Sequence, residues 1–187
     1  MNNYPYLIAS LPELALSFEK SDYSYTAIRD FLYENSSEAD RRLIEWLEFS
    51  YKEENINSHF YNACRKCRNR FIKEFFAYDF AARTEKVAFL SGEQTSQVFD
   101  EKESIVKAFK IKNIVDRERQ LDTITWDKIC SLTSYGDFDV NVLLAFLAKA
   151  HLIERWSKLD KATGEMLFRK FVDEISATYT ESKKQLN

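Results

Sequence analysis

The sequence predicts an all-α protein, an elongated two-lobed helical bundle built around one long central helix. Only 3 Gly and 2 Pro occur among 187 residues, too few turn residues to separate the strands of a sandwich or barrel. Apolar residues instead recur at helical spacing along most of the chain. The longest such pattern runs from Asn57 to Leu90, and an unbroken helix there would be roughly 50 Å long. A compact globule of this chain length is only about 40 Å across, so the pattern predicts an elongated molecule.

The N-terminal segment Tyr4–Leu11 is predicted to be extended or irregular, because Pro5 and Pro12 bracket it and neither suits a helix interior. Two helices are predicted next. Their apolar residues at helical spacing are Tyr25, Ile28, Phe31 and Leu32 in the first, and Leu43, Ile44, Leu47 and Tyr51 in the second. Ser36 or Ser37 can cap the second helix, since a serine oxygen accepts a free N–H of the first turn.

The predicted central helix carries an apolar stripe whose members are three, four or seven residues apart. These are Phe60, Cys64, Cys67, Phe71, Phe75, Tyr78, Ala82 and Phe89. Ser91-Gly92 is a plausible C-cap, and polar Glu93–Ser96 is the best candidate for a hinge. The sequence therefore predicts an N-terminal lobe over residues 1–92 and a C-terminal lobe over residues 93–187, with a single continuous domain as the alternative.

Four more helical patterns fill the second half of the chain. They cover about Val98–Lys110, Asp116–Leu132, Asp139–Leu159 and Thr163–Thr178. Ser134–Asp137 is predicted to be a turn, and Asp137 or Asp139 can cap the helix that follows. Because Val140–Ile153 is apolar on nearly every face, it is predicted to be the central helix of the second lobe.

The composition argues against several classes of enzyme. Gly92, Gly136 and Gly164 are too far apart for a phosphate loop, a dinucleotide fingerprint or a nucleophile elbow. We therefore expect no cofactor and no catalytic residue, and no activity of the chain by itself. An unrecognised active site is the competing hypothesis, and it would need a concave pocket with a perturbed titratable group near His59 or His151, the only two histidines.

The pair Cys64-Arg-Lys-Cys67 has the spacing of a metal or redox site. A metal site needs about four ligands, and no second Cys or His pair lies at suitable spacing. Both cysteines fall on the apolar stripe, so we interpret them as core residues, with metal or redox chemistry as the alternative.

A basic run without any acid is the main candidate for partner binding. It contains Arg65, Lys66, Arg68, Arg70 and Lys73, in a chain whose net charge is −3. On one continuous helix Lys66, Arg70 and Lys73 would share a narrow arc. This arc is either a solvated face or a docking surface for an acidic protein, and nucleic acid is a third possibility. Tyr4 and Tyr6 are further contact candidates, since tyrosines often anchor interfaces.

Targeting signals are not recognisable in the sequence. No basic flank precedes the short apolar stretch at the N-terminus, and the longest apolar run, Val142–Ala148, is far below the roughly 20 residues that a membrane span needs. Three cysteines, an odd number, favour a reducing compartment. We expect a cytoplasmic protein, and one that reaches a membrane only through protein partners.

Several segments resemble a bacterial family of unassigned function encoded among V-type ATPase subunits. The opening Tyr4-Pro-Tyr-Leu-Ile-Ala-Ser-Leu-Pro-Glu-Leu14 looks like the start of that family. Ile114-Val-Asp-Arg-Glu-Arg119, Trp126, Phe138–Leu147 and Glu154–Phe168 are similar to its second half. Tyr78–Glu85 is similar to a segment that reads leucine–arginine–asparagine, although Ala82 and Thr84 stand here in place of the leucine and the asparagine.

That family in turn resembles a shortened C (or d) subunit of V/A-type ATPases, an all-helical funnel seated on the membrane ring and gripping the central stalk. The resemblance implies a related helical architecture and a role in coupling ATP hydrolysis or synthesis to ion movement, without nucleotide binding. The expected partners are other subunits of such an ATPase, in the central stalk and the membrane ring. The alternative is a helical adaptor that binds nucleic acid or another acidic partner through the basic run.

Overall fold

The structure is a computed structural model that describes residues 4–20, 23–93, 95–133 and 138–159, together with Met166, Arg169, Lys170 and Val172. Regular structure within these residues is entirely helical, which confirms the predicted all-α class. The α-helices are α1 (Pro5–Ala9), α2 (Tyr25–Glu34), α3 (Glu38–Phe49), α4 (Ser58–Lys66), α5 (Arg70–Ser91), α6 (Lys102–Phe109), α7 (Ile114–Ser131) and α8 (Val140–Ser157), and a short 3₁₀ helix, η1, covers Glu53–Asn55.

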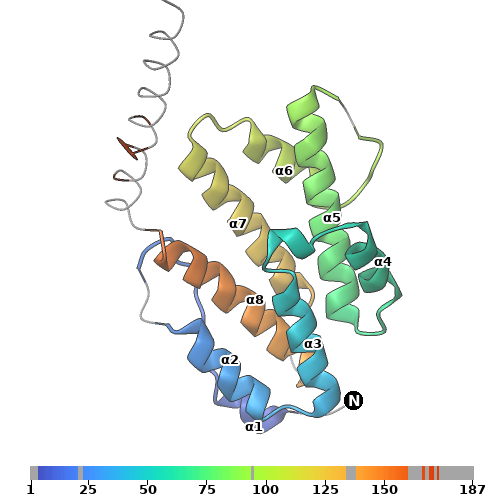
Figure 1. The fold of residues 1–187 in the computed structure, drawn as a ribbon, viewed down its shortest axis with the longest axis vertical. Coiled ribbons are helices and arrows are strands. Elements are labelled where there is room, and N and C mark those ends of the chain that lie inside the picture. The colour runs from blue at the N-terminus through green and yellow to red at the C-terminus, as the bar shows by residue number, and fades with distance from the viewer. Residues whose placement is uncertain are drawn as a thin grey trace, which may run out of the picture.

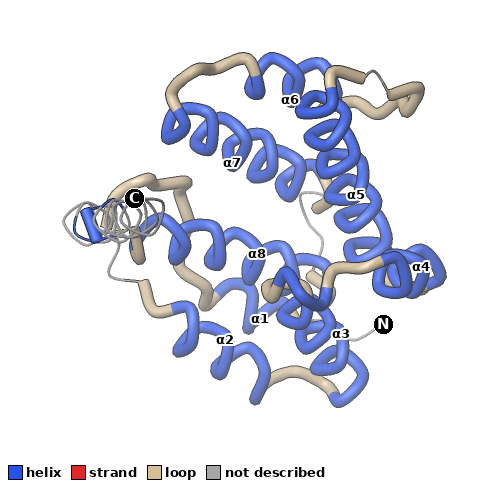
Figure 2. Tube along the Cα trace, turned by 45° about the horizontal axis from the view of Figure 1, so that its top comes forward, coloured by secondary structure: helices blue, strands red, loops and turns tan. Residues whose placement is uncertain are grey.

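The helices are arranged around α8, which packs against α2, α3, α5 and α7. Figure 1 shows α1, α2 and α3 on one side of α8 and α7 on the other, with α5 running along the edge of both groups. The tube in Figure 2 shows the same order as successive levels, from α6 and α7 through α8 to α1–α3. The apolar segment 140–153 therefore lies at the centre of the molecule, where nearly every face of its helix can be covered.

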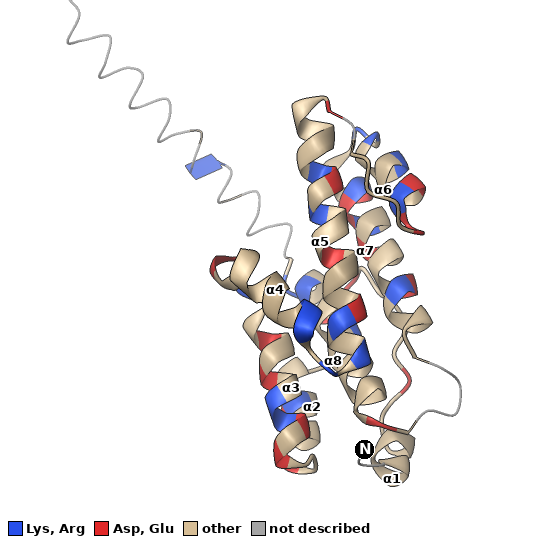
Figure 3. Cartoon of the chain, turned by 90° about the vertical axis from the view of Figure 1, so that its right-hand side faces the viewer, with Lys and Arg blue, Asp and Glu red and all other residues tan. Residues whose placement is uncertain are grey.

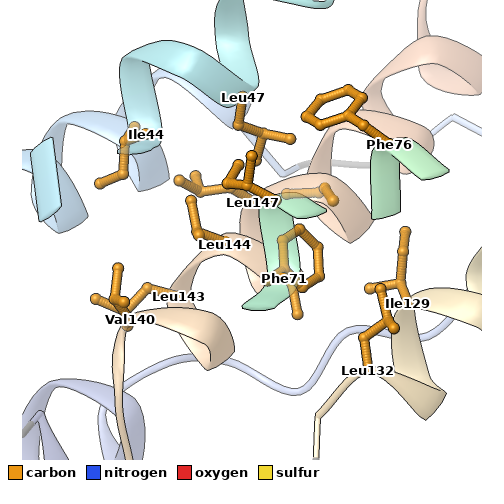
Figure 4. Close-up of a cluster of buried hydrophobic side chains, with 14 of the residues drawn as sticks. Ile44, Leu47, Phe71, Phe76, Ile129, Leu132, Val140, Leu143, Leu144 and Leu147 are labelled. Atoms are coloured by element: carbon orange, nitrogen blue, oxygen red, sulfur yellow. The ribbon is translucent and has the colours of Figure 1, made fainter. Parts of the chain in front are cut away.

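Two clusters of buried apolar residues hold these helices together. Figure 4 shows the centre of the larger cluster, where residues of α8 such as Leu144 and Leu147 meet Ile44 and Leu47 of α3 and Phe71 of α5. The smaller cluster joins α5, α6 and α7 and consists of Tyr78, Ile105, Ala108, Phe109 and Ile124. α8 follows the boundary that was predicted after Gly92, yet it belongs to the larger cluster together with α2 and α3, and α5 contributes to both clusters. The division between the two clusters therefore does not coincide with that boundary.

The predicted unbroken helix from Asn57 to Leu90 is wrong. The chain leaves helical geometry at Cys67, whose φ and ψ are −62° and 139°, so α4 ends at Lys66 and α5 begins at Arg70. α5 has 22 residues, and its length is about 33 Å, not 50 Å. The apolar stripe continues across the break because both helices pack against the larger cluster.

Asn69 explains the position of the break. Its side-chain oxygen accepts the N–H of Ile72 at 2.9 Å, which caps the first turn of α5. Its amide nitrogen donates to Oδ1 of Asn141 at 2.9 Å, and the same oxygen accepts the N–H of Phe71. Both asparagines are buried, so this network attaches the start of α5 to the start of α8.

The prediction of an irregular Tyr4–Leu11 is also wrong, because Pro5–Ala9 forms α1. Pro5 occupies the first helical position, where a proline is favoured because that N–H has no intrahelical partner. The predicted caps are confirmed at Ser37 for α3, at Asp139 for α8 and at Gly92 for α5. Gly92 has φ = 72°, a left-handed conformation that glycine adopts without steric cost.

Some expectations lie outside the described residues. They are the turn over 134–137 and most of the helix predicted over Thr163–Thr178, of which only Met166, Arg169, Lys170 and Val172 are described, all of them helical. In the part of the chain that the structure describes, no helix has both the length and the apolar character needed to cross a bilayer.

Candidate interaction surface

The basic patch consists of Arg65, Lys66, Arg68, Arg70 and Lys73, all of which are exposed. Figure 3 looks onto the side of α4 and α5, where basic residues gather near the junction of the two helices. Because of the break at Cys67, Lys66 ends α4 whereas Arg70 and Lys73 begin α5. The predicted narrow arc on one continuous helix is therefore wrong, and it is the turn between two helices that brings these cations together.

Few acidic side chains neutralise the basic patch. Arg70 forms an ion pair with Glu74, with Nε and Oε1 3.3 Å apart. Within the described residues, no ion pair is formed by Arg65, Lys66, Arg68 or Lys73. The first turn of α5 also contains no acid, so the positive end of the helix dipole adds to the charge of the patch. Such a surface attracts acidic partners and speeds their association.

A hollow of about 250 Å³ lies beside the patch, between α4 and α5. It is lined by Tyr61, Cys64, Arg65, Lys73, Phe76, Ala77, Phe80 and Gln97. The Tyr61 hydroxyl donates a hydrogen bond of 2.5 Å to Asp79, which also accepts from Arg83, so these polar groups are already satisfied. The hollow thus combines an apolar floor with two cations at its rim.

Cys64 is buried in the larger cluster, as the interpretation of the cysteine pair predicted. Burial raises the pKa of its thiol to about 12, so the sulfur is protonated and a poor nucleophile at neutral pH. Cys67 packs against the same cluster from the α4–α5 turn. No group of His, Cys, Asp or Glu side chains among the described residues has the arrangement of a metal site.

Tyr4 and Tyr6 do not join the basic patch. The Tyr4 hydroxyl donates to Oδ2 of Asp40 at 2.6 Å and accepts the N–H of Ser37 at 3.0 Å, so it helps to hold the start of α3. Tyr6 is 91% exposed on α1, and Figures 1 and 3 both show α1 well away from the α4–α5 junction. Of the two, Tyr6 alone offers a free aromatic ring to a partner.

The two histidines differ in their surroundings. His59 is exposed on α4, whereas His151 lines a groove of about 420 Å³ together with residues of α5, α6 and α7 and of the segment after α3. The His151 ring stacks on Tyr51 with ring centres 3.5 Å apart, and burial lowers the pKa of His151 to about 4. The competing active-site hypothesis therefore has the pocket and the perturbed group that it requires. The hydroxyl of Tyr51 is also buried without a hydrogen-bond partner.

The charged residues that α7 and α8 contribute to this groove are held together in one cluster. Arg155 of α8 binds Oδ2 of Asp122 at 2.6 Å and Oε2 of Glu118 at 2.7 Å. The Trp156 indole N–H donates to the same Asp122 oxygen at 2.6 Å. No hydrogen bond connects His151 to a carboxylate or hydroxyl among the described residues, so a nucleophile–base pair is not assembled there. This α7–α8 cluster was missed from the sequence, although Glu118 and Asp122 have the i, i+4 spacing of one helix face.

Comparison with protein families decides the relationship of the chain. Its residues 1–59 and 94–178 match the sequence model of a family described as a protein of unknown function, DUF2764. The chain belongs to this family. The DUF2764 match includes Tyr4, Tyr6 and the α7–α8 cluster, whereas the basic patch lies between the two matched segments. The comparison with curated proteins and the comparison with solved structures give no match.

Proposed function

We propose that the protein is a non-catalytic subunit or assembly factor of a V/A-type ATPase that connects the central stalk with the membrane ring. The observation that carries the proposal is the basic patch, five exposed cations of which four have no ion pair with a described residue. Such a surface is suited to an acidic protein partner. The resemblance of Tyr4–Leu14, Ile114–Arg119 and Glu154–Phe168 to a family encoded with V-type ATPase subunits supplies the identity of that partner.

The architecture suits a connector. A part that passes force between partners needs stiff elements that are anchored in a core, since a loosely held helix would yield under load. α5 contains no glycine over its 22 residues and contributes to both hydrophobic clusters. The basic patch lies at the start of this helix, so a partner bound there would act directly on the element shared by the two clusters.

The proposal is tested by purifying the native ATPase from the producing cells and quantifying this chain by mass spectrometry. We expect it to co-purify in a fixed ratio to the other subunits. The double variant Lys66→Glu with Arg68→Glu should reduce its retention about tenfold, because neither cation has an ion pair that the change would break. Absence of the chain from the intact complex would refute the proposal.

The matched control is Lys112→Glu, which reverses an exposed cation in the connection between α6 and α7, away from the basic patch. It makes the same kind of charge change per site and should leave retention unaltered. Equal losses for the control and for the single variant Lys66→Glu would mean that net charge, and not the patch, governs association.

The same unpaired cations also favour the alternative of a nucleic-acid adaptor, since phosphates bind exposed Lys and Arg. That function predicts retardation of DNA or RNA by the full chain at low salt, weakened by Lys66→Glu and Arg68→Glu alike. A chain that retards neither nucleic acid at low salt does not have this function.

A further inference from the structure

The exposed face of α5 continues the hollow beside the basic patch into a longer groove. A second hollow, of about 570 Å³, is lined by Ile56, Tyr61, Phe80, Arg83, Thr84, Lys86, Val87, Ala88, Glu93 and Thr95. The two hollows share Tyr61 and Phe80, so together they form one depression along the helix. We refer to this depression as the α5 groove.

The floor of the α5 groove is a single helical stripe. The lining residues of α5 on this stripe are Lys73, Phe76, Ala77, Phe80, Thr84, Val87 and Ala88, spaced by three, one, three, four, three and one. From Lys73 to Ala88 the stripe is about 22 Å long, the length of about four helical turns. One wall is formed by Tyr61, Cys64 and Arg65 of α4, and the segment Thr95–Gln97 after α5 also lines the depression.

Apolar surface on this floor is open to solvent. Val87 is 64% exposed and Phe80 is 39% exposed, although their neighbours Phe76 and Ala88 are buried. Exposed apolar residues that follow one face of a helix are typical of a docking site for another apolar stripe.

The charges along the groove identify the kind of partner. Its lining contains the four cations Arg65, Lys73, Arg83 and Lys86 but the single acid Glu93. Arg83 is paired with Asp79 at 3.0 Å, whereas Arg65, Lys73 and Lys86 form no ion pair with a described residue. Arg65 and Lys73 lie at one end of the groove and Glu93 lies at the other, so the favourable place for a partner's acids is over the start of α5.

We infer that the α5 groove binds an amphipathic helix of about four turns, with an apolar stripe facing Phe80 and Val87 and acidic residues over Arg65 and Lys73. This inference rests on the proposed function in taking an acidic protein as the partner, and it adds the segment of that partner and its binding mode. The apolar stripe supplies burial, and the charges select the register and reject basic helices.

The test uses the full chain and a fluorescent synthetic peptide of four turns, with leucines at i, i+3, i+4 and i+7 spacing and glutamates on the flanks. A second peptide of the same composition, with the leucines spread around the helix, is the control. We expect fluorescence anisotropy to show binding of the first peptide at least tenfold tighter than that of the second. Equal affinities for the two peptides would refute the inference.

Variants of the chain locate the site. Val87→Glu should weaken binding of the first peptide at least tenfold, because it places a charge on the apolar floor. Leu90→Glu is the matched control, since Leu90 is 73% exposed on the same helix but does not line the groove. Equal effects of the two substitutions, with helix content unchanged by circular dichroism, would overturn the inference. So would a dimer of the chain that Val87→Glu dissociates in sedimentation, since the occupant would then be a second copy.

The test of the α5 groove and the test of the proposed function can fail independently. If the chain co-purifies with the ATPase and Val87→Glu is retained as well as the unmodified chain, the inference about the groove fails and the proposed function stands. If the acidic peptide binds in the groove but the chain is absent from the ATPase, the proposed function fails and the groove remains a site for another acidic helix.

Discussion

Among the described residues, nineteen buried side chains from six helices form the larger hydrophobic cluster, whereas five from three helices form the smaller one. The larger one surrounds α8 and includes the fully buried Leu143, Leu144 and Leu147. The smaller one lies between α5, α6 and α7, and its buried members all come from residues 78–124, three helices that follow one another in the sequence. Burial of apolar area is the main stabilising term in folding, so the two regions must differ in local stability.

Two ion pairs also connect the helices and segments around the smaller cluster. Lys102 binds Oε1 of Glu85 at 3.0 Å and donates to the carbonyl oxygens of Thr95 and Gln97, which holds the segment after α5. Lys128 binds Glu101 at 2.9 Å, which joins α7 to the start of α6. Because the smaller cluster buries far fewer apolar side chains than the larger one, we expect α6 to open locally at a lower free energy than the whole molecule.

The largest expected effect is in the larger cluster. Leu144→Ala should lower the free energy of unfolding by about 3–5 kcal/mol, because the side chain is fully buried where α8 meets its neighbours and the cavity cannot collapse. Urea denaturation followed by circular dichroism measures the change. Leu144→Met keeps most of the volume and should cost less than about 1.5 kcal/mol. A loss below that value for the alanine variant would mean that the region is loosely packed.

A matched truncation in the smaller cluster should act more locally. Ile105→Ala removes a buried side chain of α6 and should cost about 2–4 kcal/mol of local stability. Hydrogen exchange read by mass spectrometry should show faster exchange in α6 and the adjoining part of α7, with α8 unchanged. Equally faster exchange in α8 would show that the two clusters unfold as one unit.

A smaller, pH-dependent effect on the free energy of unfolding is expected from His151, which lines the groove of about 420 Å³. Burial lowers the pKa of His151 to about 4, below the value of about 6.5 expected for an unfolded chain. Between these values the unfolded chain binds the extra proton, so stability is full above about pH 6.5 and is lost as the pH falls towards 4. The expected loss from this residue is about 3 kcal/mol, since each unit of pKa difference corresponds to about 1.4 kcal/mol.

The measurement compares the unmodified chain with His151→Phe, which keeps a ring next to Tyr51 but cannot be protonated. Carboxylates titrate in the same range in both proteins, so the difference between the two pH profiles isolates the histidine. Parallel profiles from pH 7 to pH 4 would contradict the prediction and would mean that His151 is protonated as readily in the folded chain as in the unfolded one.

Local rules were enough to predict much of the fold. Ser37, Gly92 and Asp139 end or begin helices where capping chemistry places them, because a cap needs only the residue and the neighbouring backbone groups. Pro5 shows the limit of such rules, since a proline both excludes a helix interior and suits the first helical position. The residues next to Pro5 did not show whether it would exclude a helix or begin one.

The candidate site was predicted only in part. The basic run identified cations that are exposed, because five cations without an intervening acid cannot all be buried. The sequence pattern could not show that Tyr61, Phe80 and Thr95 line one depression, since they come from α4, α5 and the segment after α5. Tyr4 was predicted as a contact residue for a partner protein. Its hydroxyl instead donates a hydrogen bond to Asp40 at the start of α3, 36 residues away in the sequence.

What the sequence by itself determined is the all-helical class, most helix ends and the positive charge of the segment that joins α4 to α5, because each depends on neighbours within a few residues. The tertiary structure alone decided the break between these two helices, where Asn69 meets Asn141 of α8 across 72 positions in the chain. It also decided which apolar faces were left uncovered along α5. Contacts between distant segments depend on how whole helices pack, and helical periodicity carries no information about the partner that each face will meet.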